Sequence, residues 1–67
     1  MGIVKNVARN LHDMRLQRKL SQKALAEKAG LSVSYISMLE RGQRIPPLET
    51  LEVMAKVLRV NPVHLLH

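Results

Sequence analysis

The chain begins with apolar residues at helical spacing. They are separated by three or four positions, which predicts one face of an amphipathic helix over residues 3–18. Leu16 falls off this face, and Arg18 and Lys19 place cations at the helix end, where the helix dipole favours them. The members of the apolar face are Val4, Val7, Leu11 and Met14.

Two short helices are predicted in the middle of the chain. Ser21 and Ser32 stand where helices begin, because a Ser hydroxyl accepts a hydrogen bond from an otherwise unpaired N–H of the first turn. Gly30 and Gly42 stand where helices end, since the left-handed backbone conformation is favourable for glycine. Two capped helices joined by a tight turn are the sequence form of a helix-turn-helix. The motif covers residues 21–41, with helices over 22–29 and 33–41.

The second of these helices divides its residues between two faces. Ile36 and Leu39, joined by Leu31, are expected to face the core, and the helix before it contributes Leu25, Ala26 and Ala29. A valine and a methionine on the outer face are unusual for a solvated helix and favour contact with thymine methyl groups. Ordinary exposure of apolar residues is the alternative. The outer face consists of Val33, Ser34, Ser37, Met38 and Arg41.

The last third of the chain predicts a loop and two more helices. Residues 42–47 are predicted as a connection in which the two prolines push Ile45 and Pro46 to extended geometry. Pro47 can then take the first position of a helix over about 47–58. Asn61 and Pro62 then open a short fifth helix that ends near Leu66. With five helices and no strand, we predict an all-α fold and one domain over residues 1–67. The apolar face of the fourth helix comprises Leu48, Leu51, Met54, Ala55 and Leu58.

The charge of the chain is strongly basic and unevenly distributed. Residues 1–44 carry nine Lys or Arg against three acidic residues, while residues 45–67 carry two of each. The whole formal net charge of +6 therefore lies in the part that contains the helix pair. A basic face on a small domain indicates a polyanionic partner. A basic surface that is merely solvated is the alternative.

The low aromatic content of the chain bears on which kind of nucleic acid it binds. Tyr35 is the one aromatic residue of the chain. Proteins that bind single strands stack successive bases on several aromatic side chains. The composition therefore favours double-stranded DNA.

Residues suited to catalysis or metal binding are scarce. There is no cysteine, and His64 with His67 supplies two ligands at most, which do not complete a zinc site. Ser37 has no base at a triad-like spacing, and there is no glycine-rich phosphate loop. We expect neither an enzyme nor a metal, cofactor or small-molecule ligand. Apolar runs are too short for a membrane span or a signal peptide, so we expect a cytoplasmic protein.

Several motifs together resemble the Cro/C1-type (XRE) helix-turn-helix family. The resemblance covers about residues 7–66 and implies a five-helix, lambda-repressor-like domain that binds a two-fold DNA operator as a dimer. We expect a repressor of transcription, associated with the nucleoid, with helix 33–41 in the major groove. The motifs are Leu-Ser-Gln at 20–22, Leu-Ala-Glu-Lys-Ala-Gly-Leu-Ser at 25–32, Tyr-Ile-Ser-Met-Leu-Glu-Arg-Gly at 35–42, Pro46, and Leu-Glu-Thr-Leu at 48–51 with Ala55.

The resemblance also implies roles for individual residues. Base edges would meet Val33, Ser34 and Met38, with Ser37 beside them. Gln22 would bind a backbone phosphate through its side chain and N–H. Further contacts with the DNA backbone are expected from Ser32, Tyr35, Arg41, Arg44 and Lys23.

Two of these roles have competing interpretations. Arg15 and Glu40 match a structural pair that joins the first helix to the third, and the alternative is that Arg15 reaches the DNA backbone. Tyr35 packs against the second helix or directs its hydroxyl to a phosphate, and we favour the phosphate.

The sequence departs from the family pattern at two places. The family commonly has Ser or Thr as a helix cap where Pro47 stands. The reading positions also lack the long amide and guanidinium side chains that make bidentate base contacts.

The fifth helix predicts association between two chains. It carries more apolar side chains than one short helix buries in its own domain, so we predict a homodimer interface there. A different function, a protein-interaction or antitoxin-like module, would use the same motif to bind a protein, but the charge distribution disfavours it. Membrane association through residues 3–18 ranks last. The predicted interface residues are Val60, Val63, Leu65 and Leu66.

Overall fold

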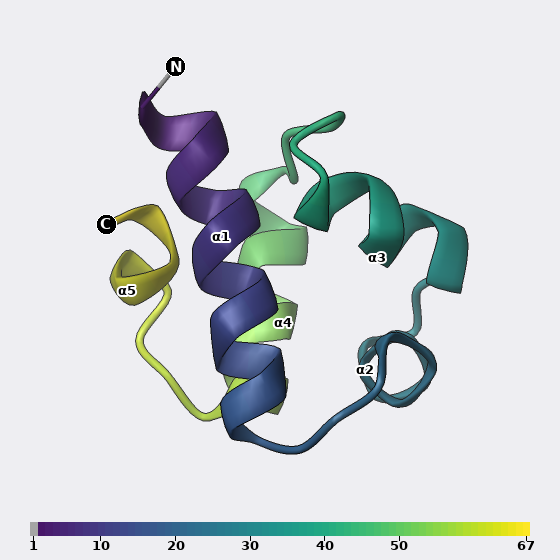
Figure 1. Cartoon of the computed structure of the whole chain (residues 1–67). Helices are drawn as coiled ribbons and strands as arrows, with labels where there is room; N and C mark the ends of the chain where they lie inside the picture. Colours follow the sequence, from purple (N-terminus) through teal and green to yellow (C-terminus); the bar gives the residue numbers. More distant parts are fainter. Residues whose placement is uncertain (1) are drawn as a thin grey trace.

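The computed structural model describes residues 2–67 and confirms an all-α fold (Figure 1). Four helix ends differ from the prediction by one residue, and the first helix covers residues 2–17 rather than 3–18. The third helix ends at Glu40, one residue early, and the fourth begins after Pro47, whose ψ of 161° is extended. Pro47 therefore occupies the cap position without a side-chain hydrogen bond. The helices of the described residues are α1 (Gly2–Gln17), α2 (Gln22–Ala29), α3 (Val33–Glu40), α4 (Leu48–Leu58) and α5 (Val63–Leu66).

The caps of the central helix pair confirm the sequence prediction. The Ser21 hydroxyl accepts from the N–H of Ala24 at 2.9 Å, and the Ser32 hydroxyl accepts from the N–H of Tyr35 at 3.1 Å. Gly30 and Gly42 have left-handed backbones, with φ of 71° and 73°. Each cap satisfies backbone groups that a short helix leaves unpaired. The turn between α2 and α3 is therefore fixed by local chemistry.

The helices enclose one core to which every helix contributes. α1 packs against α3 and α5, and α2 packs against α3 and α4. Figure 1 shows α1 in front of α4, with α5 on one side and the α2–α3 pair on the other. Leu16 lies off the apolar face of α1 and is exposed, as predicted. The core cluster consists of Val7, Leu11, Leu25, Ala26, Ile36, Leu39, Leu51, Met54, Ala55, Leu58 and Leu65.

One core prediction for α4 is wrong. Leu48 is 66% exposed, although it continues the apolar spacing of the helix. It is the first helical residue, and the buried face of α4 begins one turn later at Leu51. The spacing of apolar residues gives the face of a helix, but it does not show how far along that face other helices cover it.

Part of the predicted dimer interface is also wrong, because Leu65 is fully buried in its own domain. α5 is held against α1 by asparagine side chains. The Asn10 amide donates to the carbonyls of His64 and Leu65, both at 3.2 Å, and the Asn6 amide donates to that of Leu66 at 3.4 Å. These bonds cap the carboxyl end of α5 and seat Leu65 in the core.

The other predicted interface residues lie nearer the surface. Val60 and Leu66 are half-buried and pack against the core cluster. Val63 is 42% exposed. Of the four residues, Val63 offers the most apolar surface to a partner.

Candidate nucleic-acid interface

A buried polar network fixes α3 to the rest of the domain. The Arg15 Nε donates to Glu40 Oε2 at 2.6 Å and the Arg15 Nη2 to Glu40 Oε1 at 3.0 Å, with side chains 9% and 4% exposed. Arg15 Nη1 also donates to the carbonyl of Leu20 at 2.8 Å. Bidentate geometry of this kind is strong and directional. The structure thus brings Arg15 and Glu40 together as a structural pair and keeps Arg15 away from the surface.

Gln22, which was expected to contact a phosphate, is a third member of this network. The Gln22 side-chain amide donates to Glu40 Oε1 at 3.1 Å. Glu40 Oε1 therefore accepts from both Arg15 Nη2 and the Gln22 amide. This bond within the protein was not expected from the sequence, and the phosphate contact of Gln22 stays a prediction. Gln22 and Glu40 are 18 positions apart, and no sequence pattern links them. The network joins α1, α2 and α3 through one carboxylate.

Because α3 ends at Glu40, Arg41 lies beyond it, and the outer face of the helix itself (Val33, Ser34, Ser37 and Met38) is uncharged. Val33 is 42% exposed and Ser34 is also exposed, while Ser37 and Met38 are half-buried. On the opposite face, core residues of α3 are 0% and 1% exposed. The face therefore presents hydroxyl and apolar groups from a helix whose other side is anchored in the core.

Exposed cationic side chains lie on the segments next to α3 in the motif. Lys23 on α2 and Arg41 and Arg44 after α3 are all exposed. The Arg44 guanidinium carbon lies 5.9 Å from the centre of the Tyr35 ring, which is within range of a cation–π interaction. Tyr35 is half-buried and packs against the core cluster, and Ser32 is engaged as the cap of α3. The contact between Arg44 and Tyr35 was not anticipated from the sequence.

Other kinds of site find little support in the part of the chain that the structure describes. Within residues 2–67, no three His, Cys, Asp or Glu side chains gather into a metal-binding group. None of the helices from Gly2 to Leu66 is long and apolar enough to cross a membrane. The outer face of α3, with the exposed cations on the segments next to it, remains the candidate site.

The fold and this face define a small all-α helix-turn-helix domain. The sequence model of the Helix-turn-helix family HTH_3 matches residues 11–65, and the chain belongs to this family. The resemblance to Cro/C1-type proteins is thereby confirmed. An immunity repressor of Bacillus phage phi105 is 44% identical over 55 residues, which are 82% of this chain and 38% of that protein. The chain thus spans well under half the length of this relative.

Solved structures share the fold over nearly the whole chain. The restriction-modification controller protein C.AhdI from Aeromonas hydrophila has a TM-score of 0.88 at 34% identity, over 92% of this chain and 94% of that one. The biofilm regulator SinR, solved in complex with DNA, has a TM-score of 0.87 at 34% identity, over 91% and 98%. The all-α fold described above is thus shared with a restriction-modification controller protein and a master regulator for biofilm formation.

Proposed function

We propose that this chain is a sequence-specific regulator of transcription that binds double-stranded DNA and acts as a repressor. The observation that carries the proposal is the uncharged outer face of α3. Glu40 fixes this helix to α1 through Arg15, and the exposed cations Lys23, Arg41 and Arg44 lie on the segments next to it. In protein–DNA interfaces, cations on phosphates set the register and the groups between them meet base edges. The family membership and the DNA complex of SinR support the same proposal.

In this proposal α3 enters the major groove. Apolar side chains contact thymine methyl groups, and serine hydroxyls bond to base edges. Because these side chains are short, base recognition also relies on the shape and deformability of the DNA. The proposed base-contacting residues are Val33, Ser34, Ser37 and Met38. Backbone contacts come from Lys23, Arg41 and Arg44, with Ser32, Tyr35 and the N–H of Gln22 at the margins.

We further propose that two chains bind a two-fold operator. A dimer would place its two α3 helices about 34–36 Å apart in successive major grooves. The exposed side chain of Val63, bordered by Val60 and Leu66, supports an interface at α5. A regulator of this kind acts on the nucleoid, in the cytoplasm.

Selection of bound duplexes from a random pool tests the proposal. We expect an enriched site with two-fold symmetry, and binding that weakens steeply with salt, because cations on phosphates displace condensed counterions. Binding to duplex DNA that is absent or insensitive to salt would contradict the proposal. It would favour instead a module whose main partner is a protein.

A further inference from the structure

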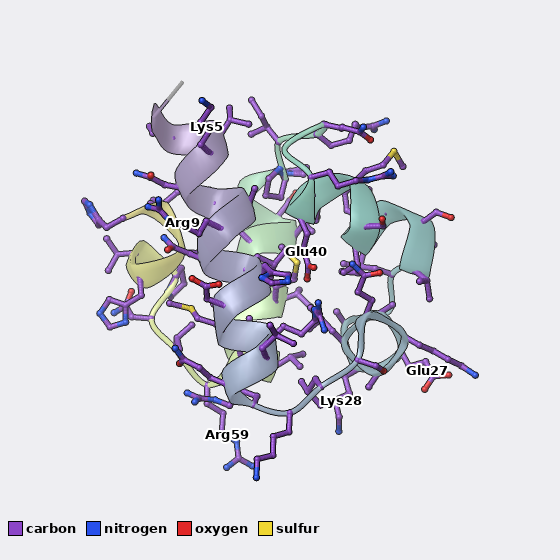
Figure 2. The ribbon with its side chains drawn as sticks, in the orientation of Figure 1. Lys5, Arg9, Glu27, Lys28, Glu40 and Arg59 are labelled. Carbon is purple, nitrogen blue, oxygen red and sulfur yellow. The ribbon has the colours of Figure 1, made fainter. Side chains whose placement is uncertain are left out.

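A second basic surface lies away from α3. A cleft of about 580 Å³ opens where the carboxyl ends of α1, α2 and α4 meet. Figure 1 shows the carboxyl ends of α1 and α4 at the bottom of the molecule, while α3 and the loop after it lie higher. Figure 2 places Lys28 and Arg59 at this lower end. The cleft is lined by Arg18, Leu20, Lys28, Val57 and Arg59.

Two of the three cations of the cleft have a distinctive relation to the backbone. Arg18 Nε donates to the carbonyl of Leu58 at 2.7 Å, which uses one of its five donors and leaves its side chain at the rim. Arg59 ends α4 in a left-handed conformation, with φ of 60°. Such a conformation is strained for any residue with a Cβ atom. Where α2 and α3 end, the chain places Gly30 and Gly42 in the same conformation, whereas Lys19 after α1 is a second non-glycine residue in it, with φ of 58°.

Helix dipoles account for only part of this arrangement. A cation near the carboxyl end of a helix is favourable in itself. That effect does not require the strained backbone of Arg59, nor does it explain an apolar floor between the cations. Leu20 and Val57 form this floor and are both half-buried. A cleft with an apolar floor and a cationic rim matches an apolar side chain that has carboxylates beside it.

We propose that this cleft docks an acidic segment of a partner protein. An apolar side chain of the segment lies on Leu20 and Val57, and neighbouring carboxylates pair with Arg18, Lys28 and Arg59. Nucleic acid fits less well, because its sugar–phosphate backbone is contacted mainly by polar and charged groups and offers no apolar side chain to cover Leu20 and Val57. The surface is separate from α3, so the chain has the means to bind DNA and an acidic partner at the same time.

The first test is NMR titration of the whole chain with the peptide Glu-Asp-Leu-Leu-Glu-Asp. We expect chemical-shift changes centred on Leu20, Lys28 and Val57, and much weaker changes with the uncharged peptide Gln-Asn-Leu-Leu-Gln-Asn. Changes spread evenly over all basic residues would overturn the proposal, since they indicate non-specific attraction. Equal changes at the cleft with a short random-sequence duplex would also overturn it, in favour of a second nucleic-acid contact.

The second test compares Arg59→Gly with Lys5→Ala. Both remove one exposed positive charge, and Figure 2 places Lys5 at the other end of the molecule. Arg59→Gly relieves the left-handed strain, so its midpoint of thermal unfolding should be no lower than that of the parent. We expect it to weaken peptide binding by roughly 2- to 5-fold, which is the loss of one exposed ion pair.

The Lys5→Ala control should weaken peptide binding by less than Arg59→Gly does. The affinity of Arg59→Gly for the selected operator duplex should stay close to that of Lys5→Ala. Equal weakening of peptide binding by the two variants would refute the docking site. If the parent chain bound no duplex DNA, the proposed function would be refuted, whereas the test of peptide docking would still stand.

Discussion

At the scale of single residues, Glu40 connects the structure to the proposed function. Its carboxylate accepts two hydrogen bonds from Arg15 and one from Gln22, so one side chain at the end of α3 ties together three helices. The residues that face outward lie on the same helix. Their orientation toward a DNA groove therefore depends on a carboxylate that is itself almost inaccessible to solvent.

Removing this carboxylate should unfold the domain. Glu40→Ala leaves the Arg15 charge buried without its partner, which typically lowers the free energy of unfolding by about 3–5 kcal/mol. A domain of this size has roughly 3–5 kcal/mol in total. Urea unfolding followed by circular dichroism measures the change. The double variant Arg15→Met/Glu40→Leu removes both charges and should be more stable than Glu40→Ala. An equally unstable double variant would show that the pair contributes mainly by packing.

Met38→Ala tests the role of the α3 face in sequence recognition. The side chain is half-buried on this face, and losing its contact with base edges should change which bases are preferred at one position of the site. Comparison of selected duplexes for the parent and the variant measures this. A uniform loss of affinity with unchanged preference would exclude Met38 as a base-contacting residue.

Arg44→Ala should behave differently, because its guanidinium is proposed to contact a phosphate. Affinity should fall by a similar factor for all sequences, and the slope of log affinity against log salt should become shallower by about 1. Binding measured across a salt series on two unrelated duplexes gives both quantities. A change of preferred sequence would assign Arg44 to base contact instead.

At the scale of the helices, capping determines where elements end and how the last one is held. Ser21 and Ser32 begin α2 and α3 with local hydrogen bonds. α5 has only four residues and is too short to be stable alone. It depends on tertiary bonds from Asn6 and Asn10 of α1.

Asn10→Ala should therefore loosen α5 selectively. It removes the donor to two carbonyls, and we expect the free energy of unfolding to fall by about 1 kcal/mol. Hydrogen exchange should quicken in α5 more than in α2 or α3, because the motif caps are untouched. Uniform quickening along the chain would mean that α5 unfolds only together with the whole domain.

At the scale of the whole molecule, six of the cationic side chains belong to two separate surfaces. Lys23, Arg41 and Arg44 lie on the segments next to α3, whereas Arg18, Lys28 and Arg59 line the cleft at the far end. The uneven charge along the sequence indicated one polyanionic partner. The fold separates the charges into a proposed DNA interface and a proposed docking surface for an acidic partner.

Association of two chains is also a property at this scale. Val63→Asp puts a charge on the exposed apolar residue of α5, and a carboxylate at an apolar interface is strongly unfavourable. We expect sedimentation velocity to show less dimer than for the parent, with helix content unchanged. Leu16→Asp changes a leucine of α1 that is 52% exposed, against 42% for Val63, and serves as the control. A parent chain that stays monomeric with and without operator DNA would contradict the proposed dimer.

The sequence alone determined the helices, their caps and most of the core, because these features depend on spacing and local hydrogen bonds. The wrong predictions concern Leu48 and Leu65, and the bond from the Gln22 side chain to Glu40 was missed, because the surroundings of these residues come from distant parts of the chain. Whether an apolar side chain faces the core or solvent depends on where neighbouring helices end. Only the tertiary structure showed that α5 is held by α1, and that cations in one stretch of sequence lie at opposite ends of the molecule. Helical periodicity shows on which side of its helix a residue lies, but long-range packing decides whether that side contacts another helix or solvent.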